Sequence, residues 1–386
     1  MKLSKTLLAI GMSVSLLIAS CPTSNALSSI NSIKGTNKYE TAGLIADKQN
    51  YDIAILINSE NGLSDGLSAS GLSGAKNAPI LLTKKDTIPS ETLKRLEKVK
   101  EVYLIGGKNS IGASVQKILS DKKISINRIS GIDRIDTRHK VAKEIGRVST
   151  VKKVILTNAF KGEPDAMSVA SIAVRDKSPI VLTDGNTTSF ATDGLETYAI
   201  GGKVSMSDKL INETKATRIG GVDRYDTNKQ IINKFYNGSK EFYIASGTDL
   251  VYSLVGSTIA QKTPIVLVGN GSNKSILKNA SKITAIGNID DVVIKQCLNI
   301  TNNVGDSNTG IVKDTNSNNT NKPSNEPSSN NPGLTDKSTV YVTPNGKSYH
   351  LTKNCSTLKR SKTINKVTLK QAKSQGKIDP CNVCVK

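Results

Sequence analysis

The sequence predicts an α/β protein built from three copies of one unit, each with a parallel sheet covered by helices on both faces. Two observations lead to this prediction. First, three landmarks recur in the same order with a period near 90 residues. Second, short and wholly apolar runs alternate with helical periodicity within each copy, which is typical of parallel strands buried on both faces. We therefore expect three small doubly wound modules, over residues 27–121, 122–214 and 215–301.

The three landmarks identify the copies. The first reads RISGIDRIDT at 128–137 and RIGGVDRYDT at 218–227, with a weaker form, IKGTNKYET, at 33–41. The second is an apolar run headed by a proline, at Pro79, Pro179 and Pro264. The third is an apolar run that ends in Gly-Gly or Gly-Asn, at 103–107, 198–202 and 284–288. Three landmarks in one order, three times, indicate internal duplication.

The first copy shows the expected order of elements. It predicts strands at 53–57, 80–82 and 102–105, and helices at 63–75 and 90–99. A proline can lead a strand, since the first residue need not donate to the ladder. The Asp-Thr pair that ends each full opening motif stands just before a helical pattern. We expect Asp136 or Thr137, and their counterparts in the next copy, to cap those helices.

The arginines of the opening motif have two interpretations, and both stay open. In one, Arg134 and Arg224 pair with Asp136, Asp226 or nearby caps and hold the turn. In the other, they and the adjacent helix N-termini bind phosphate or carboxylate groups. The proline-headed runs are expected to be core strands, although ligands of open α/β sheets gather at the carboxyl ends of such strands. The candidate binding residues are Arg128, Arg134, Arg218, Arg224, Lys38, Asp65, Asp165, Pro79, Pro179 and Pro264.

Composition narrows the function. The chain carries 53 Lys and Arg against 32 Asp and Glu, a formal net charge of +21, which predicts a polyanionic partner. It has no Trp and only 4% aromatic residues, which argues against a carbohydrate surface of stacked rings. Two histidines, no phosphate-binding loop and no GxGxxG after a strand argue against an enzyme. On that view, Asp65 and Asp165 are helix caps or packing residues.

The arrangement resembles the cell wall-binding repeat 2 family of Gram-positive, especially clostridial, surface proteins. The resemblance rests on the motifs at 128–137 and 218–227, the proline-headed runs and the Ile-Gly-Gly landmarks. It implies a Rossmann-like fold for each repeat, three repeats around a pseudo-threefold axis, and non-covalent attachment to an anionic secondary polymer of the cell wall. Two copies depart from the pattern. Ser32 stands where the first arginine belongs in copy one, and Leu250 replaces Asp65 and Asp165 in copy three.

The N-terminus predicts export. Lys2 and Lys5 precede an apolar run that is too short to span a bilayer well, as in a secretory signal peptide at 1–26. Ordinary cleavage after Ala26 and lipoprotein-type cleavage before Cys21 both remain open. We expect the exported protein at the wall or surface of a Gram-positive cell. Residues 302–337 are rich in Asn, Ser and Pro, which predicts a flexible linker.

The tail, residues 338–386, predicts a structural zinc site. Its ligand set is His350, Cys355, Cys381 and Cys384. A module this small needs a bound metal or a disulfide to fold. The alternative is a disulfide, because export favours oxidation, but three cysteines leave one unpaired. Cys297 is expected to be a separate core residue. The tail resembles small metal-binding modules with one histidine and three cysteines, related to the Ada-type zinc domain. An alternative function is polyanion or nucleic-acid binding through this basic tail.

Overall fold

The computed structural model describes two compact units, residues 1–309 and 310–386, which are treated separately below. Within the first, it describes residues 27, 29–60, 63 and 66–302. Within the second, it describes 338–344, 346, 348–353, 355–358, 361, 363–375, 377 and 379–381. The expected signal peptide, the linker beyond residue 302, Asp65 and Cys384 lie outside the described residues.

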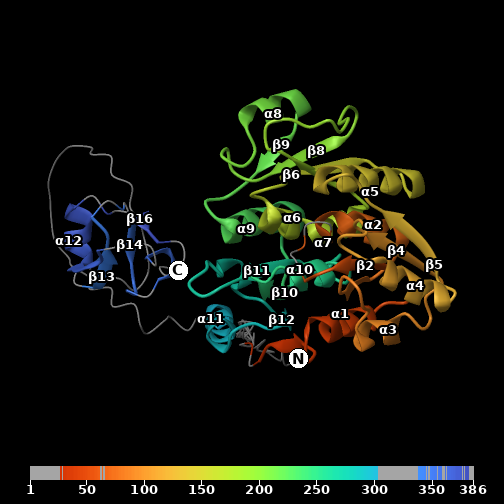
Figure 1. Cartoon of the computed structure of the whole chain (residues 1–386), viewed down its shortest axis with the longest axis horizontal. Helices are drawn as coiled ribbons and strands as arrows, with labels where there is room; N and C mark the ends of the chain where they lie inside the picture. The colour runs from red at the N-terminus through yellow and green to blue at the C-terminus, as the bar shows by residue number, and fades with distance from the viewer. Residues whose placement is uncertain are drawn as a thin grey trace, which may run out of the picture. The chain divides into compact units, whose positions relative to one another are not determined.

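Three parallel four-stranded sheets form the first unit, which confirms the predicted α/β class with parallel-sheet repeats (Figure 1). The first sheet has the order β3 (Ile80–Thr83), β2 (Ile53–Asn58), β4 (Glu101–Ile105), β5 (Ser125–Ile129). The second has the order β7 (Ile180–Thr183), β6 (Lys153–Asn158), β8 (Glu196–Ile200), β9 (Thr217–Ile219). The third has the order β11 (Ile265–Val268), β10 (Glu241–Ser246), β12 (Lys282–Ile286), β1 (Asn31–Ile33).

The fourth strand of each sheet comes from the opening motif of another copy. β5 and β9 belong to the motifs that open the second and third copies, yet they complete the first and second sheets. The third sheet is completed by β1, in which Ile33 lies opposite Ile286. The Gly287 N–H also donates to the Ile33 carbonyl at 2.9 Å. Sheet and sequence repeat are thus offset by one strand, and β1, the first strand of the chain's described part, closes the last sheet.

Helices link and cover the sheets. α1 packs on β3, α5 on β7 and α9 on β11, so each helix after an opening motif covers the sheet next to the one its strand completes. The described helices of this unit are α1 (Lys38–Ala46), α2 (Ala69–Lys76), α3 (Ser90–Arg95), α4 (Ala113–Asp121), α5 (Arg134–Val148), α6 (Glu163–Ser168), α7 (Ala170–Asp176), α8 (Asp208–Thr214), α9 (Arg224–Phe235), α10 (Val251–Gly256) and α11 (Asp291–Thr301), with 3-10 turns at Gly66–Ser68 and Ser275–Leu277.

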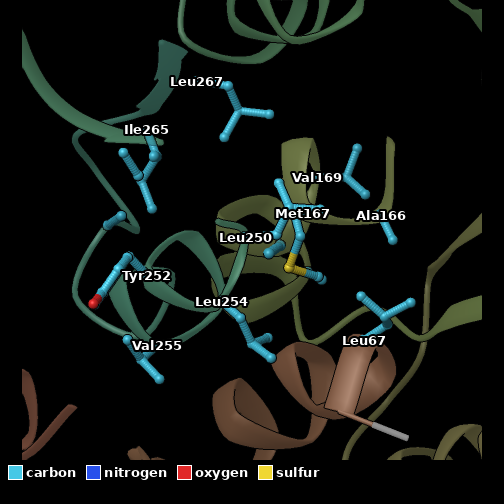
Figure 2. Close-up of a cluster of buried hydrophobic side chains, with 14 of the residues drawn as sticks. Leu67, Ala166, Met167, Val169, Leu250, Tyr252, Leu254, Val255, Ile265 and Leu267 are labelled. Atoms are coloured by element: carbon cyan, nitrogen blue, oxygen red, sulfur yellow. The ribbon is translucent and has the colours of Figure 1, made fainter. Parts of the chain in front are cut away.

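One apolar core runs through all three modules. Leu67, Met167 and Leu254 come from different modules, and all three are at most 2% exposed in one cluster (Figure 2). Burying a leucine fully contributes about 1.5–3 kcal/mol, so these contacts join the modules firmly. Small residues allow the close approach of α2 to α7, since a β-carbon at Gly74 would overlap the Val174 carbonyl.

The second unit is a small mixed sheet with its own core. Its strand order is β15 (Asn365–Thr368), β13 (Thr339–Val342), β14 (Ser348–His350), β16 (Asp379–Pro380). A 3-10 turn (Ser356–Leu358) and α12 (Leu369–Ser374) accompany it, and Val340, Tyr349 and Ala372 are buried in its core. Across the described residues, no helix has the length and apolar character needed to cross a bilayer.

Candidate functional site

The opening motif forms a fixed turn followed by a helix start. Asp133, not Asp136 or Thr137, is the N-cap of α5, and its carboxylate accepts from the N–H groups of Ile135 and Asp136, both at 2.8 Å. The expected cap position is therefore wrong by three or four residues. Thr137 lies inside the helix, where its hydroxyl accepts from the Gly131 N–H at 2.9 Å and donates to the Asp133 carbonyl at 2.9 Å. Helical periodicity misses this turn because the first helical residues are exposed.

The same turn recurs in the other copies. Asp223 caps α9 and Asn37 caps α1. The glycine of the motif is needed because the chain folds back onto the helix start. A β-carbon at Gly131 or Gly221 would overlap the backbone of the threonine that ends the motif. This close approach explains why glycine occupies the fourth position of each motif.

In the second copy, the last acid of the motif pairs with a lysine of the helix and not with the motif arginine. Asp136 accepts from the Ile132 N–H at 3.0 Å and pairs with Lys140 at 3.1 Å, so the interpretation in which Arg134 pairs with Asp136 is wrong. The guanidinium carbon of Arg134 lies 6.0 Å from the ring centroid of Phe160, whose side chain is 66% exposed.

The matching residues of the other copies reach across in the same way. Arg224 Nη1 donates to the Gly247 carbonyl at 2.7 Å, and Lys38 Nζ donates to the Ser59 carbonyl at 2.6 Å. Phe160, Gly247 and Ser59 all follow the central strand of the neighbouring sheet. The seventh position of the motif therefore places a cation at each junction between modules, at the carboxyl ends of the strands.

Arg128 and Arg218 hold loops within a sheet. Arg128 Nη1 donates to the Gly106 carbonyl at 2.8 Å, at the end of the neighbouring strand β4. Arg218 Nη1 donates to the Met206 carbonyl, and its Nη2 pairs with Asp208 at 2.6 Å. The first arginine of the motif thus has a structural role in both complete copies.

Two of the candidate binding residues, Asp165 and Arg224, line the same polar pocket. It occupies 210 Å³ at the carboxyl ends of β6, β8 and β9. The loop that brings Lys161 to it is held by Asn158, whose Oδ1 accepts from the N–H groups of Phe160 and Lys161 at 2.8 and 2.9 Å. The lining residues are Lys161, Pro164, Asp165, Gly202, Gly221, Asp223, Arg224 and Thr227.

Asp165 gives this pocket a group that titrates near neutrality. It lies in the first turn of α6 and close to Gly201, where a β-carbon would meet its Oδ2 at 3.0 Å. Burial raises the pKa of Asp165 to about 7, although the charge of Arg224 opposes that shift. The pocket therefore combines fixed cations with a carboxyl that can donate a hydrogen bond when protonated. Such a set suits an anionic, hydroxyl-rich ligand.

The three strand edges are not equivalent. In the third module, Leu250 is 8% exposed, and the ring of Tyr252 fills the space beside Gly287 that Asp165 takes beside Gly201. In the first module, Asp65 lies outside the described residues. Among the described residues, the second sheet therefore has a buried carboxyl at this position and the third sheet does not.

The prolines lie at the opposite ends of the sheets from these pockets. Pro79, Pro179 and Pro264 are buried just before β3, β7 and β11. Their carbonyls accept from the N–H groups of Ile55, Ile155 and Tyr243 at 3.0, 3.0 and 2.9 Å. The structure does not bring them together with the arginines.

Sequence reasoning missed Asn158, Phe160 and Lys161. A signal was present, since Asn58 and Asn158 end the central strands of the first two copies, and both side chains cap the loop that follows. Asn58 Oδ1 accepts from the Glu60 N–H at 2.8 Å in the same manner. An asparagine repeated at the end of a buried strand was the clue to the loop that lines the pocket.

The second unit brings three of the four expected metal ligands together. One ligand atom from each of His350, Cys355 and Cys381 lies within 4.8 Å of the others, and all three residues are buried. The Cys355 and Cys381 sulfurs are 3.8 Å apart, and the Thr357 hydroxyl is 3.1 Å from the Cys355 sulfur. Two thiols and an imidazole in this geometry fit the ligand preference of Zn²⁺. Cys297, by contrast, is fully buried in α11, where burial raises its pKa to about 11.

The structure thus defines an α/β protein of three repeated parallel modules that carry cations at the strand edges. The sequence matches the family described as cell wall binding domain 2 (CWB2) over residues 32–116, 128–211 and 218–296. These three ranges cover more than half of the chain, which therefore belongs to this family. The predicted family, with its three repeats, is confirmed.

Individual relatives and solved structures are similar to this chain over most of its length. The chain is 32% identical to the N-acetylmuramoyl-L-alanine amidase LytC of Bacillus subtilis over 75% of its own length and 61% of that protein. It is 29% identical to a Bacillus subtilis amidase enhancer over 64% of the chain and 36% of that protein. The structures of Cwp6 and Cwp8 from Clostridium difficile align with TM-scores of 0.65 and 0.63, at 28% and 30% identity. Each alignment covers 70% of this chain, and 48% and 52% of those chains respectively.

Proposed function

We propose that this chain is a non-catalytic surface protein, held non-covalently on the wall by three repeats that bind an anionic secondary wall polymer. The pocket at the edge of the second sheet carries the proposal, because Lys161 and Arg224 there combine two cations with a carboxyl that titrates near neutrality. Membership of a cell-wall-binding family supports it. We further propose that the repeats follow a pseudo-threefold axis, because the opening motif bridges neighbouring sheets in the same way each time.

Repetition suits a polymeric ligand. A wall polymer presents the same charged group many times, so linked modules bind it at high effective concentration. Such avidity exceeds a single affinity by ~10²–10⁴. The modules share one core, which fixes the spacing of their edges. At the third edge Leu250 replaces the acidic residue and Tyr252 fills the space beside Gly287, which implies unequal contributions from the modules.

The likeness to an amidase has a simple explanation under this proposal. The repeats cover most of the chain, and the chain spans about three fifths of LytC. We attribute the shared sequence to wall-binding repeats, with the hydrolytic activity of the relative carried elsewhere in it. The purified chain should not release soluble fragments from peptidoglycan. Turnover that Asp165→Asn abolishes would contradict the proposal.

Competition with a soluble polymer tests the binding proposal. The full chain, prebound to walls, should be released by wall polymer purified from the same cells, and raised salt alone should lower the fraction that stays bound. An uncharged polysaccharide such as dextran serves as the control. Release by both polymers alike, or by neither, would contradict recognition of anionic groups.

The second unit supports a separate proposal, that zinc stabilises the tail. His350, Cys355 and Cys381 would hold the ion, with Cys384 as the expected fourth ligand. A filled set of four ligands makes such an ion structural, since no position is left for a substrate. The alternative of a nucleic-acid-binding tail gains no support from the comparisons.

A further inference from the structure

A second cationic cavity lies along α5, separate from the pocket that contains Asp165. It occupies 500 Å³ between β5 and α5, in the junction between the first and second modules. Its lining holds four cations and one carboxylate, a net charge of +3. The residues of this groove, called here the α5 groove, are Arg128, Ile129, Ser130, Lys140, Lys143, Glu144 and Arg147.

The nearby carboxylates are already engaged. Both oxygens of Glu144 accept from Arg147 at 2.8 Å, and its Oε1 also accepts from the Tyr103 hydroxyl at 3.1 Å. Asp136, close to the groove, pairs with Lys140 at 3.1 Å. Among the described residues, no ion pair is recorded for Arg128 or Lys143. The groove therefore holds more positive charge than its own acids balance.

Arg128 is the unusual member of the set. It is half-buried, its Nη1 and Nη2 donate to the Gly106 carbonyl and to Gln116 Oε1 at 2.8 and 3.3 Å, its buried Nε has no hydrogen-bond partner among the described residues, and burial lowers its pKa. Its counterpart Arg218 has the same position in the next motif but pairs with Asp208 at 2.6 Å. A partly desolvated guanidinium without a carboxylate partner is costly, and a bound anion offsets that cost.

Unlike Arg128, which also holds a loop, the cations of α5 are not required by the fold. The other two copies build the same strand and helix with almost no cation at the matching positions. The counterparts of Arg128, Lys140, Lys143 and Arg147 are Arg218, Gln230, Asn233 and Asn237 in the third motif, and Ser32, Leu44, Asp47 and Tyr51 in the first. Three copies with one architecture and one basic groove point to a ligand, not to packing.

We infer that the α5 groove binds a stretch of linear polyanion, with the cations of α5 contacting successive anionic groups and the charge of Arg128 adding to their attraction. Lys140 and Arg147 are seven residues apart, so the helix spreads its charges over about 10 Å. That length suits successive charged groups of a chain better than a single small anion. The inference rests on the proposed function. It adds a second contact site for the polymer, apart from the carboxyl ends of the strands.

Neutralisation of the α5 lysines tests the inference. The variant Lys140→Gln with Lys143→Gln would be compared in the full chain with Lys94→Gln and Lys122→Gln, two exposed lysines outside the groove. The probes are a glycerol-phosphate polymer and polygalacturonate, which offer phosphate and carboxylate groups respectively. We expect the groove variant to bind roughly ten-fold more weakly at low salt, with a salt dependence reduced by about two released counterions. The control variant should bind as the parent does.

The outcomes separate the two proposals. A parent chain that binds neither probe contradicts the proposed function together with the groove. A groove variant that matches the parent in affinity and salt dependence overturns only the proposal that the α5 groove binds the polymer. An equal loss of affinity in the control variant overturns it too. A preference for one probe supports the groove and identifies the anionic group it recognises.

Discussion

Arg224 Nη1 donates a 2.7 Å hydrogen bond to the Gly247 carbonyl, so a guanidinium that follows the second sheet holds a loop of the third. The same guanidinium lines the pocket of Asp165. One side chain thus joins two modules and supplies charge to the candidate site. Loss of Arg224 should therefore weaken both the contact between the two sheets and the binding of the ligand.

Replacement of Arg224 tests this double role. Arg224→Gln should weaken wall retention several-fold and lower the free energy of unfolding by about 1 kcal/mol. It should also move the pKa of Asp165 further above 7, because the opposing positive charge is gone. Arg224→Lys, the control, keeps the charge and should leave that pKa near its parent value. Carboxyl titration by NMR measures the shift, and an unchanged pKa in Arg224→Gln would contradict the arrangement.

Asp165 should make stability depend on pH. Its pKa is raised from 3.8 to about 7, so the folded state binds the proton more tightly than the unfolded state. The cost of the buried charge is fully present above pH 7 and shrinks as pH falls toward 4. Asp165→Asn should therefore raise the melting temperature clearly at pH 8 and much less at pH 4. Equal effects at both pH values would show that the carboxyl is not buried as described.

The same titration should appear in binding. Below pH 7 the protonated Asp165 no longer repels an anionic ligand, so the parent chain should bind wall polymer more tightly at pH 6 than at pH 8. Asp165→Asn should remove most of that difference. The affinity for soluble wall polymer at the two pH values measures it. A parent affinity that does not change with pH would place the ligand away from this pocket.

The first strand should be essential to the last module. Ile33 is 8% exposed and pairs with β12, so Ile33→Asp would place a charge in the core at a cost of about 3 kcal/mol or more. Hydrogen exchange should rise first in β12 and β10. Asn31→Asp, an exposed change in the same strand, is the control. Faster exchange confined to the first sheet would contradict the closure by β1.

Zinc should control the folding of the tail. One equivalent per chain is expected, and a chelator should unfold residues 338–386 while the repeats keep their melting temperature. Cys355→Ser should lose the metal, whereas Cys297→Ser in the repeat unit should keep it. A Cys355–Cys381 disulfide in the native protein, found by mass spectrometry, would favour the alternative staple.

The repeat, the parallel sheets and the family were predictable because they depend on periodic patterns. The apolar run 53–57 lies in β2, which pairs in parallel with β3 and β4. Helix α3 begins at Ser90, as expected. The predicted helix extended to 99, whereas α3 ends at Arg95, with Leu96 and Val99 buried in the turn that follows. Buried turn residues continue a helical pattern, so the pattern alone could not locate the helix end.

The site was harder to predict because its contacts join different sheets. Arg224, which follows the second sheet, contacts Gly247 of the third, and β1 pairs with β12 from the other end of the repeat unit. No local pattern in the sequence indicates either contact. Lys38, Arg134 and Arg224 were singled out as candidate ligands, and the structure places each at a junction. The prolines were chosen by recurrence alone, and recurrence does not distinguish a core position at the amino end of a strand from a ligand position at its carboxyl end.

Sedimentation with cell walls tests the central proposal most directly. Purified full chain would be mixed with native walls and with the same walls stripped of their anionic polymer, and the pelleted fraction measured across salt concentrations. We expect most of the protein to pellet with native walls at low salt and little with stripped walls. Equal sedimentation with both preparations would contradict attachment through an anionic wall polymer.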